Sequence, residues 1–413
     1  MGRRSRYAQA ARPRGVSGSR GDDENLKPAT RLVRGGRRKE WTGPVVNPPV
    51  WRASTHLYDK DADRHAAGGN NADGQFFYGR RGAPTQWALA EALTQIEPGA
   101  YGTQLYPSGV AAIAGCLLAV LKPGDRLLMS DNAYDPSRSM ATGLLTRMGV
   151  KTTFFDPRDL ESFRARFAEP VKAVWLESPG SLTFEVCDVP AFAAIAREHG
   201  AVSLIDNTWA SPLGFAALEH GCDIVMMSLS KHVGGHSDLM MGSASAGKRW
   251  YTALRRTAQE LGQVVSPDDA ALAARGLRTI GVRLEAQTRS ALKIAQWLES
   301  QPHVDAVLCP MLPSAPGHAL WARDFTGGCG LFAVVLASDD PGAAARLADA
   351  LDLFGIGYSW GGFESLALPI TPKVHRSLML CPTQGRPAIR LAIGLEDTED
   401  LIADLAQALE RAA

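Results

Sequence analysis

The sequence lacks both a long hydrophobic run and an excess of charge of either sign. No apolar stretch approaches the roughly 20 residues that a membrane-spanning helix needs, so we expect no membrane partner. The formal net charge is +1, so no overall field attracts nucleic acid, and we expect no nucleic-acid partner. Any preference for an acidic ligand must come from individual arginines. These features predict a cytoplasmic protein.

Metal-binding and disulfide patterns are also missing. The six cysteines are widely scattered and form no C-x-x-C pair, and no histidines stand at a matching spacing. We therefore expect no zinc site and no other metal. Most of the thiols are expected to be buried and reduced. The cysteines are Cys116, Cys187, Cys222, Cys309, Cys329 and Cys381.

The composition is that of a soluble globular protein, with 45% hydrophobic and 21% charged residues among 413. Residues 1–40 are predicted to be a disordered basic tail, because six arginines precede the first acidic residue, Asp22. Residues 41–82 are rich in Pro, Gly, Asn and aromatics and lack periodicity, which predicts an arm reaching a neighbouring subunit. Residues 83–277 and 278–413 are expected to form a larger and a smaller domain.

Short apolar runs alternate with helical segments between about residues 100 and 250. Four runs are predicted to be strands buried on both faces: "DRLLMSD", "VKAVWLESPG", "AVSLIDNTW" and "DIVMMSLSK". This alternation predicts an α/β fold whose mainly parallel sheet is covered by helices on both sides. Residues 267–301 are predicted to be one long helix leading to a smaller α+β domain. In a parallel sheet the ligand lies outside the carboxyl ends of the strands.

Two neighbouring strands end in groups of complementary chemistry. "SLID" ends in Asp206, and "MMSLS" leads directly to Lys231, so a carboxylate and an amine are expected to face one crevice. Pyridoxal phosphate (PLP) needs both groups, because its aldehyde binds a lysine and its ring nitrogen works best beside an acid. A surface lysine and a turn-capping aspartate are the alternatives. The two residues together, with hydroxyls and glycines around Lys231, favour PLP.

A phosphate site is predicted at the start of the helix "GVAAIAGCLLAV". Ser108 and Gly109 stand there, where free N–H groups and the helix dipole attract anions, although a plain serine cap explains the pattern as well. Hydroxyls of Ser228 and Ser230 are further candidate donors. The arm segment "FYGRRG" adds Tyr78, Arg80 and Arg81, for which an exposed basic loop is the alternative.

Four other residues are candidates for contacts with the ring and the substrate. Tyr134 follows a predicted strand, and its ring is suited to stack on the cofactor, with ordinary turn packing as the alternative. Arg390 lies within the apolar strand "AIRLAIGLE", where a substrate carboxylate suits its two-pronged guanidinium. A structural ion pair with a nearby acid remains the rival interpretation. Ser359 and Trp360 belong to a glycine-rich loop of the same domain.

These residues and motifs resemble the Cys/Met-metabolism family of PLP-dependent enzymes, whose fold is the PLP-dependent transferase fold type I. "SLSKHVGGHSDLMMG" is similar to the family's cofactor-lysine signature. The likeness includes "FFYGRRG", "AYDPS", "IDNTWASP", "GLRTIGVRL" and "YSWGGFESL", and it runs from about Val45 to the C-terminus. The fold it implies has a mainly parallel seven-stranded sheet in a PLP-binding domain and a smaller α+β C-terminal domain.

The resemblance also implies a role for each candidate residue. Lys231 and Tyr134 would be catalytic, and a neighbouring subunit would supply Tyr78 and Arg80, so that a homo-oligomer, typically a tetramer built from catalytic dimers, is needed. The implied cofactor-binding set is Lys231, Asp206, Tyr134, Gly109, Val110, Ser228, Ser230, Tyr78 and Arg80. The implied substrate-binding set is Arg390, Ser359, Trp360 and Arg81, and the substrate would be a small amino-acid thioether.

Within the family, "YDPS" favours the branch that eliminates at the β-carbon over the γ-synthase and γ-lyase branches. The implied reaction is cleavage of L-cystathionine to L-homocysteine, pyruvate and ammonia. A cysteine-S-conjugate β-lyase, a γ-synthase or γ-lyase, and a non-catalytic regulatory protein with the same fold are the alternatives. Two departures stand beside Lys231: Ser230 replaces the common threonine, and His232 replaces the usual tyrosine. No role is assigned to His232 from the sequence.

Overall fold

The computed structural model describes residues 26–412 except 69–73, 371–375 and 379–380. A seven-stranded sheet forms the centre of the larger domain, in the order β1-β7-β6-β5-β4-β2-β3. Only β7 runs antiparallel to its neighbours, so the expected mainly parallel sheet is confirmed. Its strands are β1 (Gly102–Tyr106), β2 (Arg126–Ser130), β3 (Lys151–Phe155), β4 (Ala173–Glu177), β5 (Val202–Asp206), β6 (Ile224–Ser228) and β7 (Gly242–Ala246).

Helices cover both faces of this sheet. Successive side chains of a strand point to opposite faces, and here both faces carry apolar side chains that must be shielded from water. In β5, Leu204 belongs to the hydrophobic cluster under one layer of helices and Ile205 to the cluster under the other. One layer contains α6 (Gly109–Val120), α7 (Asp135–Thr142), α8 (Leu144–Arg147) and α12 (Lys248–Glu260). The other contains α5 (Pro84–Ile96), α9 (Leu160–Ala165), α10 (Val189–Glu198) and the short α11 (Ser211–Gly214), with η2 (Arg166–Ala168) after α9.

A second, five-stranded sheet forms the smaller domain, in the order β10-β11-β12-β9-β8. Strand β12 lies at its centre, antiparallel to both β11 and β9. The elements are β8 (Val304–Leu308), α14 (His318–Asp324), β9 (Leu331–Leu336), α15 (Ala343–Asp349), β10 (Gly355–Ile356), β11 (Leu366–Ile370), β12 (Ala388–Ala392) and α16 (Thr398–Ala412).

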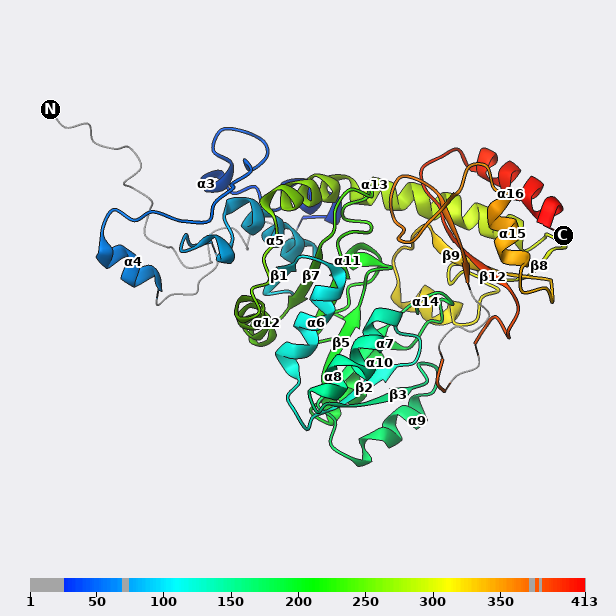
Figure 1. Ribbon diagram of the computed structural model, residues 1–413, viewed down its shortest axis with the longest axis horizontal. Coiled ribbons are helices and arrows are strands. Elements are labelled where there is room, and N and C mark those ends of the chain that lie inside the picture. Colours follow the sequence, from blue (N-terminus) through cyan, green and yellow to red (C-terminus); the bar gives the residue numbers. More distant parts are fainter. Residues whose placement is uncertain (1–25, 69–73, 371–375, 379–380, 413) are drawn as a thin grey trace.

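The 32-residue helix α13 (Pro267–Leu298) connects the two domains and lies along both, as Figure 1 shows. Its start is well marked, since Ser266 caps the N–H groups of Asp268 and Asp269 and Pro267 occupies the first turn. At 1.5 Å per residue the helix is about 48 Å long. The domain boundary expected at residue 277 falls inside this helix, so the domains share one continuous element.

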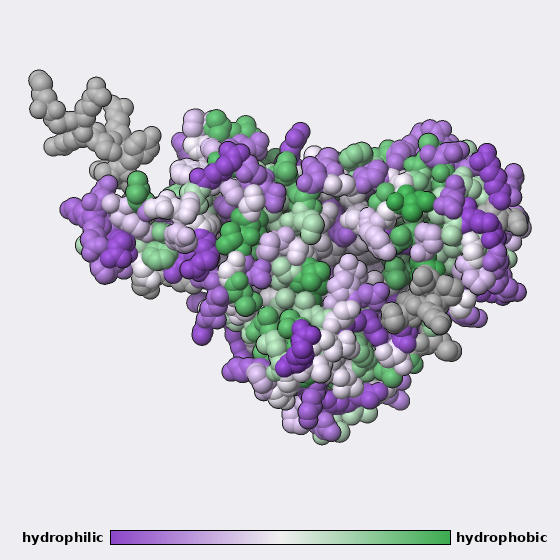
Figure 2. Space-filling model, viewed as in Figure 1, coloured by the Kyte–Doolittle hydropathy of each residue, from purple (hydrophilic) through white to green (hydrophobic). Residues whose placement is uncertain are grey.

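The N-terminal region contains α2 (Pro28–Arg34), α3 (Lys39–Thr42), α4 (Asp61–Gly68) and η1 (Gly79–Arg81). Part of the expected disordered tail is therefore ordered, because Leu32 on α2 is 4% exposed and packs in the main hydrophobic cluster. Residues 1–25 lie outside the described part. Around α4 the chain extends away from the body, where Figures 1 and 2 show a separate lobe. Within the described ranges no helix is long and apolar enough to cross a bilayer.

Candidate active site

Asp206 and Lys231 lie at the same edge of the large sheet. Strands β5 and β6 are parallel neighbours, with Asp206 paired in register to Met226, so both chains leave the sheet at their carboxyl ends together. Strand β6 ends at Ser228, and the Lys231 N–H donates to the Ser228 carbonyl at 3.3 Å, which starts a tight turn. The structure thus brings together the amine and the carboxylate that the sequence pattern placed in one crevice.

The amine of Lys231 is held by a loop of the smaller domain. Its Nζ donates to Ser359 Oγ at 2.7 Å and lies 5.4 Å from the centre of the Trp360 ring. Burial, and after it the positive charge of Arg390, lower the pKa of Lys231 to about 8, although the negative charge of Asp206 opposes them. Roughly a tenth of this amine is therefore neutral at pH 7, far more than for an ordinary lysine, and a neutral amine can act as a nucleophile or a base.

Asp206 is a buried acid with local support for its charge. Burial raises its pKa, while Lys231 and the N–H and hydroxyl of Thr208, at 3.0 and 2.5 Å from Oδ1, hold the pKa down. An anion at this depth needs a positive partner in the crevice. A protonated pyridine nitrogen is such a partner, which fits the donor and acceptor set here to the ring of PLP.

Tyr134 stands at the carboxyl end of β2, on the residue before helix α7. Its backbone N–H donates to Glu177 Oε2 at 2.7 Å, and 43% of the residue is exposed. Burial raises the phenol pKa, and the negative charges of Asp206 and Glu177 raise it further. The ring therefore stays a neutral phenol near Asp206, available to stack on a planar ligand.

The start of helix α6 lies beside β6 and presents free backbone N–H groups. Ser108 caps the helix by accepting from the Ala111 N–H at 3.0 Å, which leaves the N–H groups of Gly109 and Val110 without intrahelical acceptors. A Cβ on Gly109 would lie 2.8 Å from the hydroxyl oxygen of Ser228, so only glycine permits this approach. The Ser228 hydroxyl and the helix N–H groups together provide donors suited to a phosphate.

Ser230 is placed differently from Ser228. Its hydroxyl accepts from the Met241 N–H at 2.9 Å and lies 3.3 Å from the Met241 carbonyl oxygen. These contacts tie the end of β6 to the residue before β7. A phosphate contact of Ser230 stays a prediction.

Arg390 is buried in the middle of β12 and points toward the loop that holds Lys231. Its Nη2 donates to the Ser359 carbonyl at 2.7 Å, while its buried Nε has no partner among the described residues. Burial lowers its pKa to about 10, so the guanidinium remains charged at neutral pH. A charged group with an unused donor at the crevice is suited to a substrate carboxylate. Ser359 itself adopts a φ of +76°, which orients its hydroxyl toward the amine.

The three arm residues lie apart from this group. Arg80 donates to the Gln259 carbonyl near the end of α12, the guanidinium of Arg81 lies over the Phe77 ring, and Tyr78 is 46% exposed. The described contacts therefore anchor the arm segment to its own chain beside α12 and do not bring it to Lys231.

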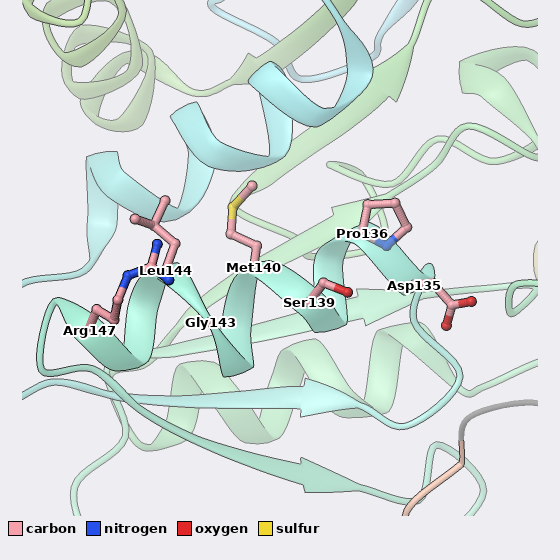
Figure 3. Close-up of a pocket in the computed structure, with 7 residues that line it drawn as sticks. All are labelled: Asp135, Pro136, Ser139, Met140, Gly143, Leu144 and Arg147. Atoms are coloured by element: carbon pink, nitrogen blue, oxygen red, sulfur yellow. The ribbon is translucent and has the colours of Figure 1, made fainter.

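Two features near the candidate site, a surface hollow and an acidic residue, were not among the site residues predicted from the sequence. The open hollow along α7 and α8 in Figure 3 is lined by residues such as Pro136, Met140 and Arg147, none of which was predicted to bind a ligand. Glu177, in contrast, was missed although it pairs in register with Asp206 and contacts Tyr134. It ends the strand "AVWLE", so the strand-end rule that found Asp206 also points to Glu177.

Comparisons with known proteins agree with this geometry. The family model described as Cys/Met metabolism PLP-dependent enzyme matches residues 29–410. Cystathionine beta-lyase MetC of Escherichia coli (strain K12) is 43% identical over 385 residues, which cover 91% of this chain and 96% of that protein. A putative cystathionine beta-lyase of Rhizobium johnstonii is 44% identical over 364 residues, 87% of this chain and 90% of that protein.

A solved structure has the same fold along nearly the whole chain. The crystal structure of cystathionine gamma synthase from Xanthomonas oryzae pv. oryzae in complex with cystathionine has a TM-score of 0.85 and 32% identity. It covers 94% of this chain and 98% of that chain. The family match also begins earlier than the motif resemblance, since it includes residues 29–40 as well as the arm.

Proposed function

The chain belongs to the Cys/Met metabolism family of PLP-dependent enzymes, and from that premise we propose that it is a cystathionine β-lyase. It is a PLP-dependent carbon–sulfur lyase. In the proposed reaction L-cystathionine and water give L-homocysteine, pyruvate and ammonia. The observation that carries the proposal is the juxtaposition of Lys231, with its lowered pKa, Asp206 and Arg390 around one crevice.

PLP, when bound, provides an electron sink that stabilises negative charge on the substrate α-carbon. Lys231 would hold its aldehyde carbon, and Asp206 would hold the proton on its ring nitrogen. Gly109, Val110 and the Ser228 hydroxyl would hold its phosphate, and Tyr134 would stack on its ring. Each assignment uses a donor or acceptor that the fold already presents at the carboxyl end of the sheet.

Lys231 is proposed to move the protons of the reaction. Once the substrate amine has taken its place on the aldehyde carbon, the freed amine of Lys231, kept neutral by its lowered pKa, takes the proton from the substrate α-carbon. The carbon–sulfur bond at the β-carbon then breaks, and the electron pair leaves with sulfur. The ammonium of Lys231, or the phenol of Tyr134, returns a proton to the thiolate. The remaining enamine is hydrolysed by water to pyruvate and ammonia.

Arg390 and Ser359 are proposed to orient the substrate. The unused Nε and the Nη2 of Arg390 form a two-pronged donor for the α-carboxylate. The Ser359 hydroxyl limits where the amine of Lys231 can point. Trp360 beside it excludes water from that amine, and Arg81 is placed among the substrate-binding residues on the family resemblance alone.

The arm is proposed to complete the site of a neighbouring subunit in a homo-oligomer, most simply a tetramer of catalytic dimers. Support comes from Arg80, which donates to the Gln259 carbonyl near the end of α12 of its own chain, and from Tyr78, which is 46% exposed. Tyr78 is half-exposed and Arg80 is a cation, so both are suited to a phosphate on another chain.

The direct test is to identify the products from L-cystathionine. Pyruvate and homocysteine are expected, and Lys231→Ala should abolish both without loss of folded protein. If 2-oxobutyrate and cysteine form instead, the enzyme is a γ-lyase and the β-lyase assignment is wrong. A γ-synthase is the second candidate, because the Xanthomonas relative covers 94% of this chain. Cystathionine formation from cysteine and an activated homoserine would identify it.

A further inference from the structure

His232, the residue directly after Lys231, is buried and makes one hydrogen bond. It is 2% exposed, and its Nε2 lies 3.2 Å from the Trp209 carbonyl oxygen. A carbonyl only accepts, so Nε2 carries the proton and Nδ1 is bare. Nδ1 has no partner among the described residues. Burial, and after it the positive charge of Arg283, lower the pKa of His232 to about 3, so the ring is neutral.

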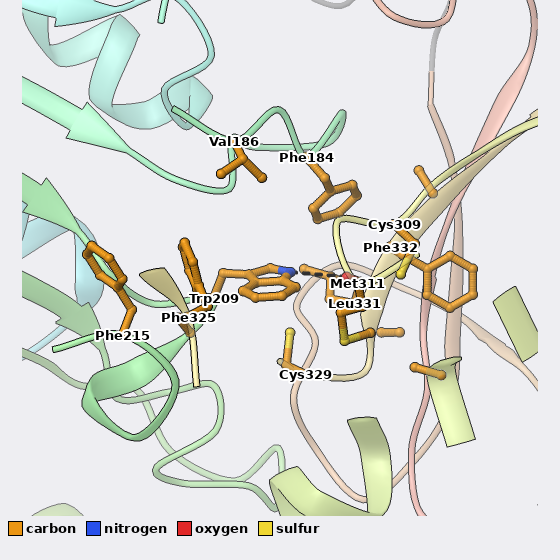
Figure 4. Packing of buried hydrophobic residues seen from close by; sticks show 14 of the residues in the cluster. Phe184, Val186, Trp209, Phe215, Cys309, Met311, Phe325, Cys329, Leu331 and Phe332 are labelled. Atoms are coloured by element: carbon orange, nitrogen blue, oxygen red, sulfur yellow. Dashed lines mark hydrogen bonds between the residues drawn. The ribbon is translucent and has the colours of Figure 1, made fainter. Parts of the chain in front are cut away.

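The acceptor of this hydrogen bond is itself fixed. Trp209 Nε1 donates to the Leu331 carbonyl at 3.1 Å, which joins the larger domain to β9 of the smaller one. Figure 4 shows the indole surrounded by buried side chains that include Phe325, Met311 and Cys329. The His232 ring is therefore hydrogen-bonded to the Trp209 backbone, which cannot shift without disturbing the core between the two domains.

The other side of the His232 ring presses on the loop that holds the amine of Lys231. Its ring centre lies 5.1 Å from that of Trp360, at an interplanar angle of 63°. A Cβ on Gly361, which has a φ of +81°, would lie 3.0 Å from His232 Nδ1. The loop of residues 359–362 thus packs on the ring and backbone of His232 in direct contact.

Helix α13 contacts both the turn after His232 and the loop of residues 359–362. The guanidinium of Arg283 lies against the turn after His232, because a Cβ on Gly235 would lie 2.0 Å from its Nη1. Gln287, one helical turn later, donates to the Gly362 carbonyl at 2.6 Å. His232 therefore fills the space between the turn that carries Lys231 and the loop that carries Ser359, and α13 holds each of them.

We propose that His232 is a positioning residue that fixes the Ser359–Trp360 loop against the amine of Lys231. The Nε2–H of His232 fixes the orientation of the ring by donating to the Trp209 carbonyl. The ring in turn fixes the positions of Trp360 and Gly361, which pack against it. Ser359 and Trp360 then define where Nζ lies, at 2.7 Å from the hydroxyl and 5.4 Å from the indole centre. The inference depends on the proposed function only in taking Lys231 as the lysine that binds PLP.

Three substitutions separate the two contacts of the ring. His232→Phe keeps the ring and removes the donor, His232→Gln keeps a donor and removes the ring, and His232→Ala removes both. His199→Ala is the matched control, because His199 is exposed at the end of α10 and stacks on Phe167, away from the crevice. All variants are to be made as full-length holoenzyme.

Three measurements are taken on each variant. The first is kcat and KM with L-cystathionine, and the second is the pH midpoint of the absorbance change of lysine-bound PLP. The third is hydrogen exchange of peptides that span residues 357–364, compared with peptides from the central strands. Loss of positioning should lower kcat of His232→Ala by roughly 10- to 100-fold. It should also raise the pH midpoint, because water entering beside Lys231 stabilises its charged form.

The proposal expects faster exchange at residues 357–364 alone, and smaller effects in His232→Phe and His232→Gln than in His232→Ala. Wild-type kcat, midpoint and loop exchange in His232→Ala would overturn it. Faster exchange throughout the sheet, with an unchanged midpoint, would show a merely structural role and overturn it as well. If His232→Ala does not fold, the same three measurements on His232→Phe and His232→Gln test the proposal. If the wild type does not cleave cystathionine, the midpoint and the exchange still test the inference, since both need only bound PLP.

Discussion

The Lys231 amine and the Ser359 hydroxyl lie 2.7 Å apart although 128 residues separate them in the chain. Lys231 leaves the large sheet and Ser359 belongs to the smaller domain, so this hydrogen bond crosses the interface between the domains. The reactive amine is therefore positioned jointly by both domains. A substitution in either one can change the chemistry without touching the substrate.

Ser359→Ala should lower kcat/KM by about 10-fold, because the amine loses the group that orients it. The folded protein should lose little stability, since Ser359 is not buried and its loop remains held by Arg390 and Gln287. Steady-state kinetics with L-cystathionine and thermal unfolding check the two parts. An unchanged kcat/KM would show that the hydroxyl does not orient the amine during turnover.

Covalent capture of PLP by the cofactor-free enzyme should become faster as pH rises and level off above a midpoint near the Lys231 pKa of about 8. The reason is that only the neutral amine attacks an aldehyde. Arg390→Met removes a cation that lowers this pKa, so its midpoint should move up. Asp206→Asn removes an anion that raises it, so its midpoint should move down. Stopped-flow absorbance at several pH values measures all three, and shifts of opposite sign would refute the assigned electrostatics.

Asp206→Asn should lower kcat by roughly 100-fold or more, because the negative charge that supports the ring nitrogen is lost. The cofactor-free form of the same variant should unfold at a higher temperature at pH 7. Burial raises the pKa of Asp206 in the folded state, so its ionisation there opposes folding as pH rises above the usual carboxyl range. Calorimetry of the cofactor-free wild type and variant measures the difference in unfolding temperature, and so the stability that the enzyme loses by keeping this catalytic carboxylate. A lower unfolding temperature in the variant would contradict it.

Glu97 should make the protein less stable as pH rises from about 4.5 to about 8. Glu97 is 2% exposed, neither side-chain oxygen has a hydrogen bond of normal geometry among the described residues, and burial raises its pKa to about 8 although the Leu218 backbone opposes the rise. The folded state therefore binds a proton that the unfolded state releases, and the loss reaches up to about 5 kcal/mol. Glu97→Gln should flatten the dependence of denaturant unfolding on pH, and an equally steep dependence in the variant would contradict the assignment.

Hybrid oligomers should show whether the arm acts on the neighbouring subunit. Lys231→Ala and Arg80→Ala subunits should each be impaired alone, but a hybrid dimer should contain one site with an intact Lys231 and an intact Arg80. Equal mixing after unfolding and refolding should restore about a quarter of the sites. No recovery on mixing would place Arg80 in its own subunit's site. Mixing Lys231→Ala with itself is the control.

The main site residues could be predicted because the rule that found them is topological. Asp206 ends one strand with a strong apolar pattern, Lys231 follows the end of the next by three residues, and parallel strands bring their carboxyl ends to one edge. Strand β7, "GSASA", has no such pattern, although all five of its residues are buried between β1 and β6. Small side chains are required there because a Cβ on Gly242 would lie 2.4 Å from the Ser108 carbonyl oxygen. That constraint comes from the neighbouring helix and is invisible in the strand itself.

Contacts made across the domains could not be predicted. Ser359 lies opposite Lys231 with a backbone φ of +76°, in a loop whose next residues, Trp360 and Gly361, pack against His232, and no local pattern encodes either feature. The order of α2 was missed for a similar reason. Its seven residues carry two arginines, and it is held by the burial of Leu32 and by the Arg278 guanidinium, which donates to the Leu32 carbonyl.

Helix α13 fixes the separation between the turn that carries Lys231 and the loop that carries Ser359. Gly276 lies against the turn that follows Lys231, and Gln287, eleven residues later, donates to the Gly362 carbonyl in the loop that carries Ser359. About 16 Å of helix therefore separates these two contacts. One inserted residue between them would turn Gln287 by about 100° and release the loop. A change in chain length along this interval would therefore change the size of the site.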